Sequence, residues 1–260
     1  MSLGVPPVSA DEYLRGILAR EAVDSATRSP LRALDGEVLR VLNAVTAGRR
    51  MELYPTGAFE KGTANSSGRQ IDFLASFAPT TTDTVGHLYG QIFGTLDKLG
   101  YEPRRRDVSI AVTLKNVVLD IIPARREAMM SDVHEVWLPR LGKIVKTNLT
   151  QHILDIQASG RREEIRVIKI WRDRQGLDFP SFYLELSVIA ALRRRPQAAL
   201  AENVWAVLGY LESLFPARSA LDPVNAVNIV SDLIGPREKE AIRKAAQYAR
   251  AGRAWSEIVW

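Results

Sequence analysis

The sequence predicts an α+β fold, in which a small mixed or antiparallel sheet with helices is followed by a C-terminal helical half. Helical periodicity fills residues 8–48 and returns from about residue 147. Short runs with strand-like patterns lie between these two parts. No internal repeat or low-complexity linker interrupts the chain. We therefore expect residues 1–146 to form the sheet domain with its N-terminal helices, and residues 147–260 to form the helical domain.

Two helices are expected before the first strand. The segment SADEYLRGILAREAVD opens with Ser9, a preferred N-cap residue, and its apolar residues keep helical spacing. The segment SPLRALDGEVLRVLNAVTAG follows in the same style, with Ser29 before a proline at its start and Gly48 at its end. Both segments are typical of amphipathic helices that pack on a sheet.

The middle of the chain carries the strand patterns. MELYPTGA alternates and is expected to break at Pro55, and QIDFLASFAP is expected to be a short apolar strand that ends at Pro79. TVGHLYGQIFGTLDKLGY has the pattern of a helix stopped by Gly100. DVSIAVTLKNVVLDIIPAR contains two β-rich runs around Lys-Asn, which indicates a hairpin with Asp120 near the end of its second strand.

The remaining chain reads as helical. The expected helices lie in TNLTQHILDIQASGRREEIRVIKIWRDRQG, SFYLELSVIAALRR, LAENVWAVLGYLESLF and PREKEAIRKAAQYARAGRAWSEIVW. Trp171 and Trp205 fall on these helices, and we expect both to be core residues rather than platforms for nucleobases. Asn225 and Asn228 are expected to cap or turn the chain.

Composition limits the classes of function. The chain has 260 residues, 46% of them hydrophobic and 25% charged, which is ordinary for a globular protein. It contains no cysteine, so disulfides and cysteine zinc sites are excluded and a reducing cytoplasm is expected. No apolar run is long enough to predict a membrane partner. The formal net charge of +5 is concentrated in runs such as Arg104–Arg106 and Arg193–Arg195, which suits a polyanionic partner or a solvated surface.

One turn and two acids suggest chemistry on phosphate. Gly57 and Gly62 bracket a turn in which backbone N–H groups can approach phosphate oxygens closely. Lys61 and Thr63 add a cation and a hydroxyl to it. Asp72 lies in the strand after the turn and Asp120 in a later strand, which makes them a candidate pair for metal ions. On these residues alone, two polar residues that merely cap strands are the favoured explanation.

The stretch GAFEKGTANSSGRQIDFLASF resembles the Gly-Ser…Gly-Thr…Asp-x-Asp signature of the DNA polymerase β-like nucleotidyltransferase superfamily. It is most similar to the bacterial cGAS/DncV-like nucleotidyltransferases (CD-NTases), which make cyclic di- and oligonucleotide signals in antiphage defence. In this register, Gly57 and Ala58 take the Gly-Ser pair. Gln70 and Asp72 take the first two metal-acid places, and Asp120 in VVLDIIPA takes the third.

Later segments resemble the same family. IRVIKIWRDRQGLDFPSFYLE is similar to the Lys-x-Trp and Pro-Ser-(aromatic)-x-x-Glu pattern of its helical half. The resemblance implies that Lys169 and Ser181 reach the triphosphate of the donor and that Tyr183 stacks on a base, in a pocket in the cleft between the two halves. Glu185 is expected to be a buried partner of a basic side chain. LDPVNAVNIVSDL is similar to the segment that precedes the final helices of these proteins.

Two positions depart from the family pattern. Ala58 lacks the serine hydroxyl that helps to hold phosphate, and Gln70 offers a neutral amide where the family has a metal-binding aspartate. Removing one charge-stabilising group from an active site commonly lowers the rate by about 10²–10³. The resemblance therefore predicts a nucleotidyltransferase fold with a degenerate metal site, and leaves open whether Asp120 is a working metal ligand.

The resemblance implies Mg²⁺ (or Mn²⁺) as cofactor and a nucleoside triphosphate such as ATP or GTP as substrate. The expected function is synthesis of a cyclic di- or oligonucleotide second messenger. Two alternatives stay open at this point: a catalytically silent module that binds a nucleotide or a partner, and an enzyme that adds nucleotides to RNA. A regulatory protein or a nucleic acid is a further expected partner for the basic patches.

Overall fold

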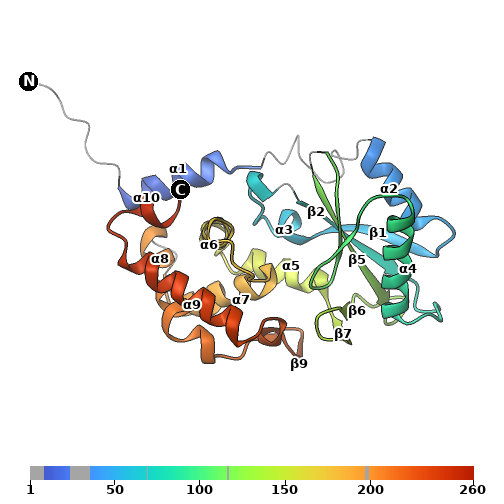
Figure 1. Cartoon of the computed structure of the whole chain (residues 1–260). Helices are drawn as coiled ribbons and strands as arrows, with labels where there is room; N and C mark the ends of the chain where they lie inside the picture. Colours follow the sequence, from blue (N-terminus) through green and yellow to red (C-terminus); the bar gives the residue numbers. More distant parts are fainter. Residues whose placement is uncertain (1–8, 24–35, 69, 116, 197–198) are drawn as a thin grey trace, which may run out of the picture. The chain divides into compact units, whose positions relative to one another are not determined.

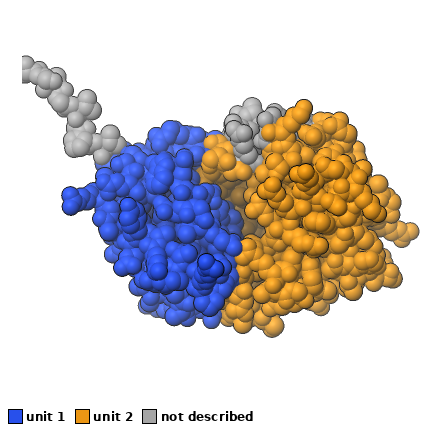
Figure 2. All heavy atoms as spheres, in the orientation of Figure 1, with its two compact units in different colours: residues 1–22, 159–220, 234–260 blue, residues 23–158, 221–233 orange. Residues whose placement is uncertain are grey.

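The computed structural model describes residues 9–23, 36–68, 70–115, 117–196 and 199–260. By their contacts, the described residues form two compact units, which are coloured separately in Figure 2. Unit 1 lies within residues 1–22, 159–220 and 234–260, and unit 2 lies within residues 23–158 and 221–233. The grouping differs from a single division after residue 146, because the first helix joins unit 1 and the segments 147–158 and 221–233 join unit 2.

Unit 2 holds the strands, which are numbered in chain order, and Figure 1 labels several of them. They are β1 (Met51–Thr56), β2 (Gln70–Phe77), β3 (Arg104–Arg105), β4 (Ile110–Thr113), β5 (Val118–Arg126), β6 (His134–Leu138), β7 (Lys143–Thr147), β8 (Leu221–Asp222) and β9 (Asn225–Ile229). Its helices are α2 (Gly36–Thr46), α3 (Gly57–Glu60), α4 (Val85–Lys98) and α5 (Leu149–Ala158), with the short 3₁₀ helices η1 (Ser66–Gly68) and η3 (Val230–Leu233).

The main sheet of unit 2 is mixed, as the sequence predicts. In the described residues its order is β1-β2-β5-β4-β3. Strand β6 pairs with the C-terminal part of β5, and β7 pairs with β6. Strands β2 and β5 run parallel, whereas the other pairs are antiparallel. The predicted hairpin is confirmed as β4 and β5. Asp120 is the third residue of β5, however, so the expectation that it lies near the end of that strand is wrong.

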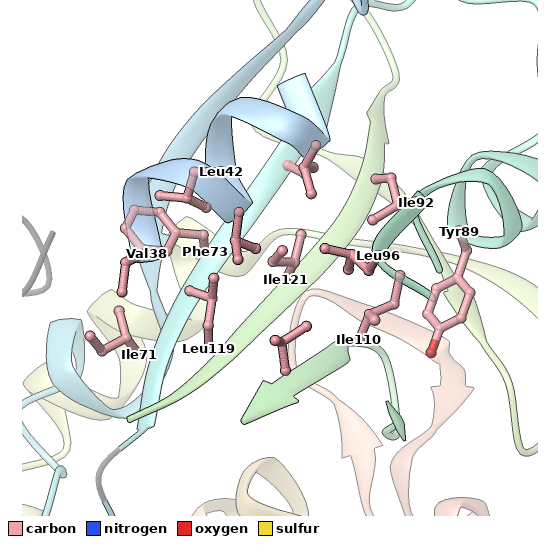
Figure 3. Close-up of a cluster of buried hydrophobic side chains, with 14 of the residues drawn as sticks. Val38, Leu42, Ile71, Phe73, Tyr89, Ile92, Leu96, Ile110, Leu119 and Ile121 are labelled. Atoms are coloured by element: carbon pink, nitrogen blue, oxygen red, sulfur yellow. The ribbon is translucent and has the colours of Figure 1, made fainter. Parts of the chain in front are cut away.

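Alternation along β2 and β5 decides which side chains face the helices. Ile71 and Phe73 of β2 and Leu119 and Ile121 of β5 are buried in one cluster with residues of α2 and α4 (Figure 3). The intervening residues point to the opposite face of the sheet. Full burial of one such aliphatic or aromatic side chain stabilises the fold by about 1.5–3 kcal/mol. A slip of one residue would move this whole set to the opposite face of the sheet, where Asp72 and Asp120 lie, so the hydrophobic pattern fixes the register.

The sequence patterns misplace or miss several elements of unit 2. Strand β1 continues through Pro55 to Thr56, because β1 is an edge strand and edge strands tolerate proline. Strands β6 and β7 and the β8–β9 hairpin are not predicted. Asn225 turns the chain as expected, since its Oδ1 accepts from the backbone N–H of Val227 at 3.3 Å. In addition, the side-chain amides of Asn225 and Asn228 donate to the carbonyl oxygen of Lys146, at 2.8 and 2.7 Å.

Unit 1 is helical. It contains α1 (Ala10–Arg20), α6 (Arg162–Arg174), α7 (Ser181–Leu192), α8 (Leu200–Ser213), α9 (Pro236–Ala251) and α10 (Trp255–Ile258), with the 3₁₀ helix η2 (Phe215–Ala217). Ser9 caps α1 as predicted, in a capping box with Glu12. The proline expected at the start of the second helix lies outside the described residues. Trp171 is fully buried, as predicted, whereas Trp205 is only partly buried.

No helix in the described part of the chain is both long and apolar enough to cross a lipid bilayer.

Candidate functional site

Two acidic side chains lie opposite each other on neighbouring strands. Asp72 of β2 and Asp120 of β5 are register partners in the parallel pair. Because both strands have the same alternation, the two side chains project from the same face of the sheet, opposite the α2–α4 cluster. Both are buried, with exposures of 8% and 4%. The prediction that these acids lie on adjacent strands is confirmed.

Gln70 joins the two carboxylates. It is two residues before Asp72 in β2, so its side chain is on the same face of the sheet. Its Nε2 donates to Oδ1 of Asp72 at 2.8 Å and also donates to Oδ2 of Asp120. Two oxygens held by one nitrogen are at most about 6 Å apart. The side-chain amide therefore supplies both N–H donors to the acid pair, at the position where the sequence resemblance implies a metal-binding aspartate.

The environment of Asp120 disfavours its negative charge. Burial is the largest cause, and the nearby charge of Asp72 adds to it; together they raise the pKa of Asp120 to about 7. Arg106 opposes this shift by a smaller amount. Oδ1 of Asp120 is buried and makes no hydrogen bond of normal geometry with the described residues. The acid pair thus contains one carboxyl group that is poised to gain or lose a proton near neutral pH.

Arg106 was not predicted to belong to this site. It lies in the basic run at residues 104–106, which the sequence indicates only as a surface patch. Its backbone N–H donates to the carbonyl oxygen of Ser109 at 2.9 Å. The charge of Arg106 acts on Asp120, so part of the positive run contributes to the field at the acid pair. The available signal in the sequence was that this basic run precedes β4, the strand that pairs with β5, which carries Asp120.

The glycine-rich turn lies directly against Asp72. Gly57 has φ +74°, and a Cβ atom added there would be 2.1 Å from Oδ2 of Asp72. Glycine is therefore required twice, for the backbone conformation and for the close approach. Gly62 also has a positive φ of 70°. The backbone N–H of Thr63 donates to the carbonyl oxygen of Ala58 at 2.8 Å, which closes the turn.

The other residues predicted for this turn have ordinary settings. Ala58 follows Gly57 in α3, and its methyl group provides no hydroxyl. Thr63 is fully buried, with its hydroxyl 3.4 Å from the carbonyl oxygen of Ala58. Lys61 is half-buried at the end of α3. The structure thus brings the turn and the acid pair together, whereas contact of Lys61 and Thr63 with phosphate stays a prediction.

The predicted triphosphate residues belong to unit 1. Lys169 of α6 is buried, and its Nζ donates to Oε1 of Glu185 in α7 at 2.7 Å. The expectation that Glu185 is a buried partner of a basic side chain is confirmed. Ser181 is the first residue of α7, and its Oγ accepts a hydrogen bond from Nη1 of Arg172 at 2.9 Å. Arg172 is a neighbour of Ser181 that the sequence motif does not indicate.

Tyr183 is 1% exposed and packs in an aromatic cluster. Its ring centroid is 5.4 Å from that of Phe179 and 5.0 Å from that of Phe215. Stacking on a nucleobase would require the ring to leave this cluster. The base-stacking role of Tyr183 stays a prediction, and the structure gives the side chain a core position.

The acid pair suits one divalent cation better than two. Among the described residues, no group of three or more acidic, histidine or cysteine side chains is placed to hold a metal ion. The buried, unsatisfied Oδ1 of Asp120 and the adjacent carboxylate of Asp72 are oxygen ligands of the kind that Mg²⁺ prefers. The amide of Gln70 adds a carbonyl oxygen to this set if it rotates by half a turn. These residues fit a single Mg²⁺ that shares its coordination with phosphate oxygens.

Comparison with known proteins supports the fold. No protein-family model and no curated protein sequence matches the chain. Among solved structures, CdnC of E. coli MS115-1 with ATP has a TM-score of 0.71 at 18% identity, covering 93% of this chain and 90% of that one. The CD-NTase CdnG of Bradyrhizobium diazoefficiens, in complex with GTP, has a TM-score of 0.68 at 15% identity, covering 95% and 94%.

An enzyme that acts on RNA has the same architecture. The Cid1 poly(U) polymerase bound to MgATP matches with a TM-score of 0.61 at 13% identity, covering 94% of this chain and 95% of that one. Likeness at these identities establishes the arrangement of helices and strands. The chain therefore has the fold of the polymerase β-like nucleotidyltransferases, as seen in the bacterial CD-NTase structures.

Proposed function

We propose that this chain is a nucleotidyltransferase of the cyclic di- or oligonucleotide synthase type, which uses a nucleoside triphosphate such as ATP or GTP. The observation that carries this proposal is the pairing of Asp72 with Asp120 beside the turn at Gly57. The likeness to CdnC with ATP and to CdnG with GTP supports a triphosphate substrate. In the setting that the sequence resemblance implies, the product would be a second messenger in antiphage defence.

The reaction joins an acceptor hydroxyl to the α-phosphorus of the donor. A new oxygen–phosphorus bond forms, the bond from the α-phosphorus to the bridging oxygen breaks, and pyrophosphate leaves. Asp120 is the candidate acceptor for the hydroxyl proton, because its pKa is raised to about 7 in the metal-free acid pair. A Mg²⁺ ion bound to its carboxylate would lower that pKa. Asp72 lies on the same face of the sheet, and its negative charge raises the pKa of Asp120, which favours proton uptake by Asp120.

Several residues are proposed to bind the donor. The N–H groups of the Gly57–Gly62 turn, with Lys61 and Thr63, would face phosphate oxygens, and Lys169 and Ser181 would contact the triphosphate as the resemblance implies. Mg²⁺ (or Mn²⁺) held by Asp72 and Asp120 would neutralise charge on the phosphates. The proposal for Lys169 requires its ammonium group to serve both Glu185 and phosphate, which its three N–H donors permit.

Turnover by the unaltered chain is proposed to be very slow. Gln70 removes one negative charge from the metal-binding set, and Ala58 removes one hydroxyl from the phosphate turn. Together these losses correspond to about 4–7 kcal/mol of transition-state stabilisation, or roughly 10³–10⁵ in rate.

A nucleotide-binding module without turnover is the second candidate, and one observation favours it. The amide of Gln70 satisfies an oxygen of each carboxylate, so the acid pair is held together without a metal ion. Such a site keeps its shape, but it has one negative charge fewer with which to attract two cations. The RNA-adding alternative rests on the likeness to the poly(U) polymerase.

The deciding experiment compares the unaltered chain with the double variant Ala58→Ser/Gln70→Asp. Each is incubated with all four nucleoside triphosphates and Mg²⁺ or Mn²⁺, with and without an RNA primer, and the products are read by mass spectrometry. We expect a cyclic or linear oligonucleotide from the double variant, and Asp120→Asn in that background should abolish it. A double variant that folds and binds triphosphate yet forms no product would favour the module. Extended primers alone would favour the RNA-adding enzyme.

A further inference from the structure

A second candidate site is lined entirely by residues of unit 1. A hollow of about 490 Å³ opens between α8, the α9–α10 connection and the residues after α7. This volume lies within the range of about 300–1,000 Å³ that is typical of small-molecule pockets. None of its lining residues belongs to the acid pair, the glycine turn or the proposed triphosphate set. The inference below therefore does not depend on the proposed function.

Two tryptophans form the aromatic part of this pocket. Trp205 of α8 and Trp255 of α10 both line it, with ring centroids 6.1 Å apart and planes inclined at 74°. A flat ring that stacks on one indole therefore meets the other edge-on, which is a favourable arrangement for aromatic groups. Ile258 adds a buried apolar side chain to the lining. Trp205 was expected to be a core residue, but it is only partly buried because one side of it borders this pocket.

The position of Trp205 is fixed in advance of any ligand. The guanidinium carbon of Arg250 lies 5.3 Å from its ring centroid, and Nε of Arg250 is 3.4 Å from Oε2 of Glu212. A Cβ atom at Gly209 would be 2.1 Å from Nη1 of Arg250, so the glycine makes room for the guanidinium beside α8. One residue pair thus holds the indole in place, and a ligand would meet an ordered ring.

Two further arginines give the pocket a positive charge. Arg195 and Arg253 line it, both are exposed, and neither guanidinium forms an ion pair with a described residue. Arg195 is the last residue of the basic run at residues 193–195. No residue of this run has a proposed role at the acid pair. Glu202 is the acidic residue of the lining. A pure polyphosphate would be repelled by that carboxylate, whereas amino or hydroxyl groups would donate hydrogen bonds to it.

We propose that this pocket binds a nucleotide unit, with its base against Trp205 and Trp255 and its phosphate on Arg195 and Arg253. An aromatic platform beside arginines is the combination that recognises a base and a phosphate at once. Glu202 accepts hydrogen bonds from the base amino group or the ribose hydroxyls. The unit is supplied either by a free mononucleotide or by a single-stranded nucleic acid, and the two sources share this chemistry.

The test uses the whole chain in buffer with EDTA, which removes the contribution of metal to any other nucleotide site. AMP, adenosine, pyrophosphate and a fluorescein-labelled single-stranded oligoribonucleotide are titrated separately, with tryptophan fluorescence, calorimetry and anisotropy as readouts. We expect AMP to quench tryptophan fluorescence and to bind more tightly than adenosine or pyrophosphate. If the oligoribonucleotide is the natural source, each phosphate contact should contribute about 0.7 to the slope of log K against log salt.

Charge-reversed variants locate the binding. Arg195→Glu and Arg253→Glu should each weaken AMP by about tenfold or more, since each removes a hydrogen bond between charged groups. Trp255→Ala should weaken AMP by roughly 5- to 150-fold, the range for loss of one base–aromatic stack, and Trp255→Phe should retain most of the affinity. Arg237→Glu makes the same charge change near the start of α9, about 20 Å along the helix from the pocket, and should leave AMP affinity unchanged.

Each outcome decides the matter. Binding of AMP that both arginine variants reduce supports the pocket, and the same losses seen only with the oligoribonucleotide also support it, with nucleic acid as the source. The proposal is overturned if neither AMP nor the oligoribonucleotide binds at millimolar concentration. It is also overturned if Arg195→Glu and Arg253→Glu behave like Arg237→Glu, or if pyrophosphate binds as tightly as AMP.

Discussion

Replacing Gln70 by aspartate tests what the amide does between the two acids. In the structure, Nε2 of Gln70 donates to both Asp72 and Asp120. Gln70→Asp removes these two hydrogen bonds and places a third negative charge on the same face of the sheet. Two like charges about 5 Å apart repel by about 3 kcal/mol at an effective dielectric constant of about 20. Gln70 is exposed, so solvent reduces this repulsion, and we expect a net loss of about 1–2 kcal/mol.

A divalent cation should reverse that loss. In EDTA, the Tm of Gln70→Asp should fall by about 2–8 °C, since 1 kcal/mol corresponds to about 2–4 °C for a domain of this size. Mg²⁺ at about 100 times its Kd stabilises a protein that binds it by about 2.7 kcal/mol, or roughly 5–10 °C. Scanning calorimetry with and without Mg²⁺ measures both shifts. The unaltered chain should respond less, because its amide already occupies the two carboxylates.

The control is Gln247→Asp, which makes the same substitution at an exposed position of α9 in unit 1. It should show neither the loss in EDTA nor the gain with Mg²⁺. If Gln70→Asp is as stable as the unaltered chain in EDTA, or if Mg²⁺ raises the Tm of both equally, the amide does not hold the acid pair as described.

Three further predictions follow from the same contacts. Gly57→Ala should destabilise unit 2 by about 1–3 kcal/mol, from the strained φ and the clash with Asp72, and urea unfolding measures it; a stable variant would contradict the contact. The raised pKa of Asp120 means that the folded state binds the extra proton between about pH 4 and 7, so stability falls as pH rises through that window, by at most about 4 kcal/mol. Asp120→Asn should remove this fall, and an unchanged pH profile would refute it. Lys169→Met alone should cost about 3–5 kcal/mol by leaving Glu185 buried without its cation, whereas Lys169→Met/Glu185→Leu should cost much less; calorimetry of ATP binding to the folded double variant then tests the proposed triphosphate role, and undiminished affinity would exclude it.

The sequence predicts the acid pair better than it predicts what lies between the acids. Alternation in QIDFLASF and in the second run of the hairpin indicates two strands, and the motif order pairs Asp72 with Asp120. The contact of Gln70 with Asp120 depends on the parallel register of β2 and β5, which local pattern does not specify because the partners are 50 residues apart. The required glycine at position 57 was predicted for phosphate, while its closest neighbour in the structure is Asp72.

Elements that depend on distant partners were the hardest to predict. Strand β7 has only one buried residue, so it lacks a two-faced hydrophobic pattern. Strand β9 has none, and the side chains of Asn225 and Asn228 tie it to β7 through Lys146. Local propensity predicts the turn bond of Asn225 to Val227, but it does not predict the contacts of both asparagines with Lys146. The sequence predicts a break at Pro55, because local pattern does not reveal that β1 lies at the edge of the sheet, where proline is tolerated.

The acid pair shows how this site can keep its shape without a metal ion. Three carboxylates on one sheet face need a cation to remain together, so an aspartate at position 70 would couple the geometry of the site to metal. With Gln70, one neutral amide holds Asp72 and Asp120 in register, and the turn at Gly57 still closes on Asp72. The chain therefore separates two properties that the aspartate combines, namely the form of the site and its affinity for metal. Gln70→Asp places a third carboxylate on this face, so its response to Mg²⁺ tests whether the amide lowers the affinity of the site for metal. Turnover is tested by the double variant with Ala58→Ser.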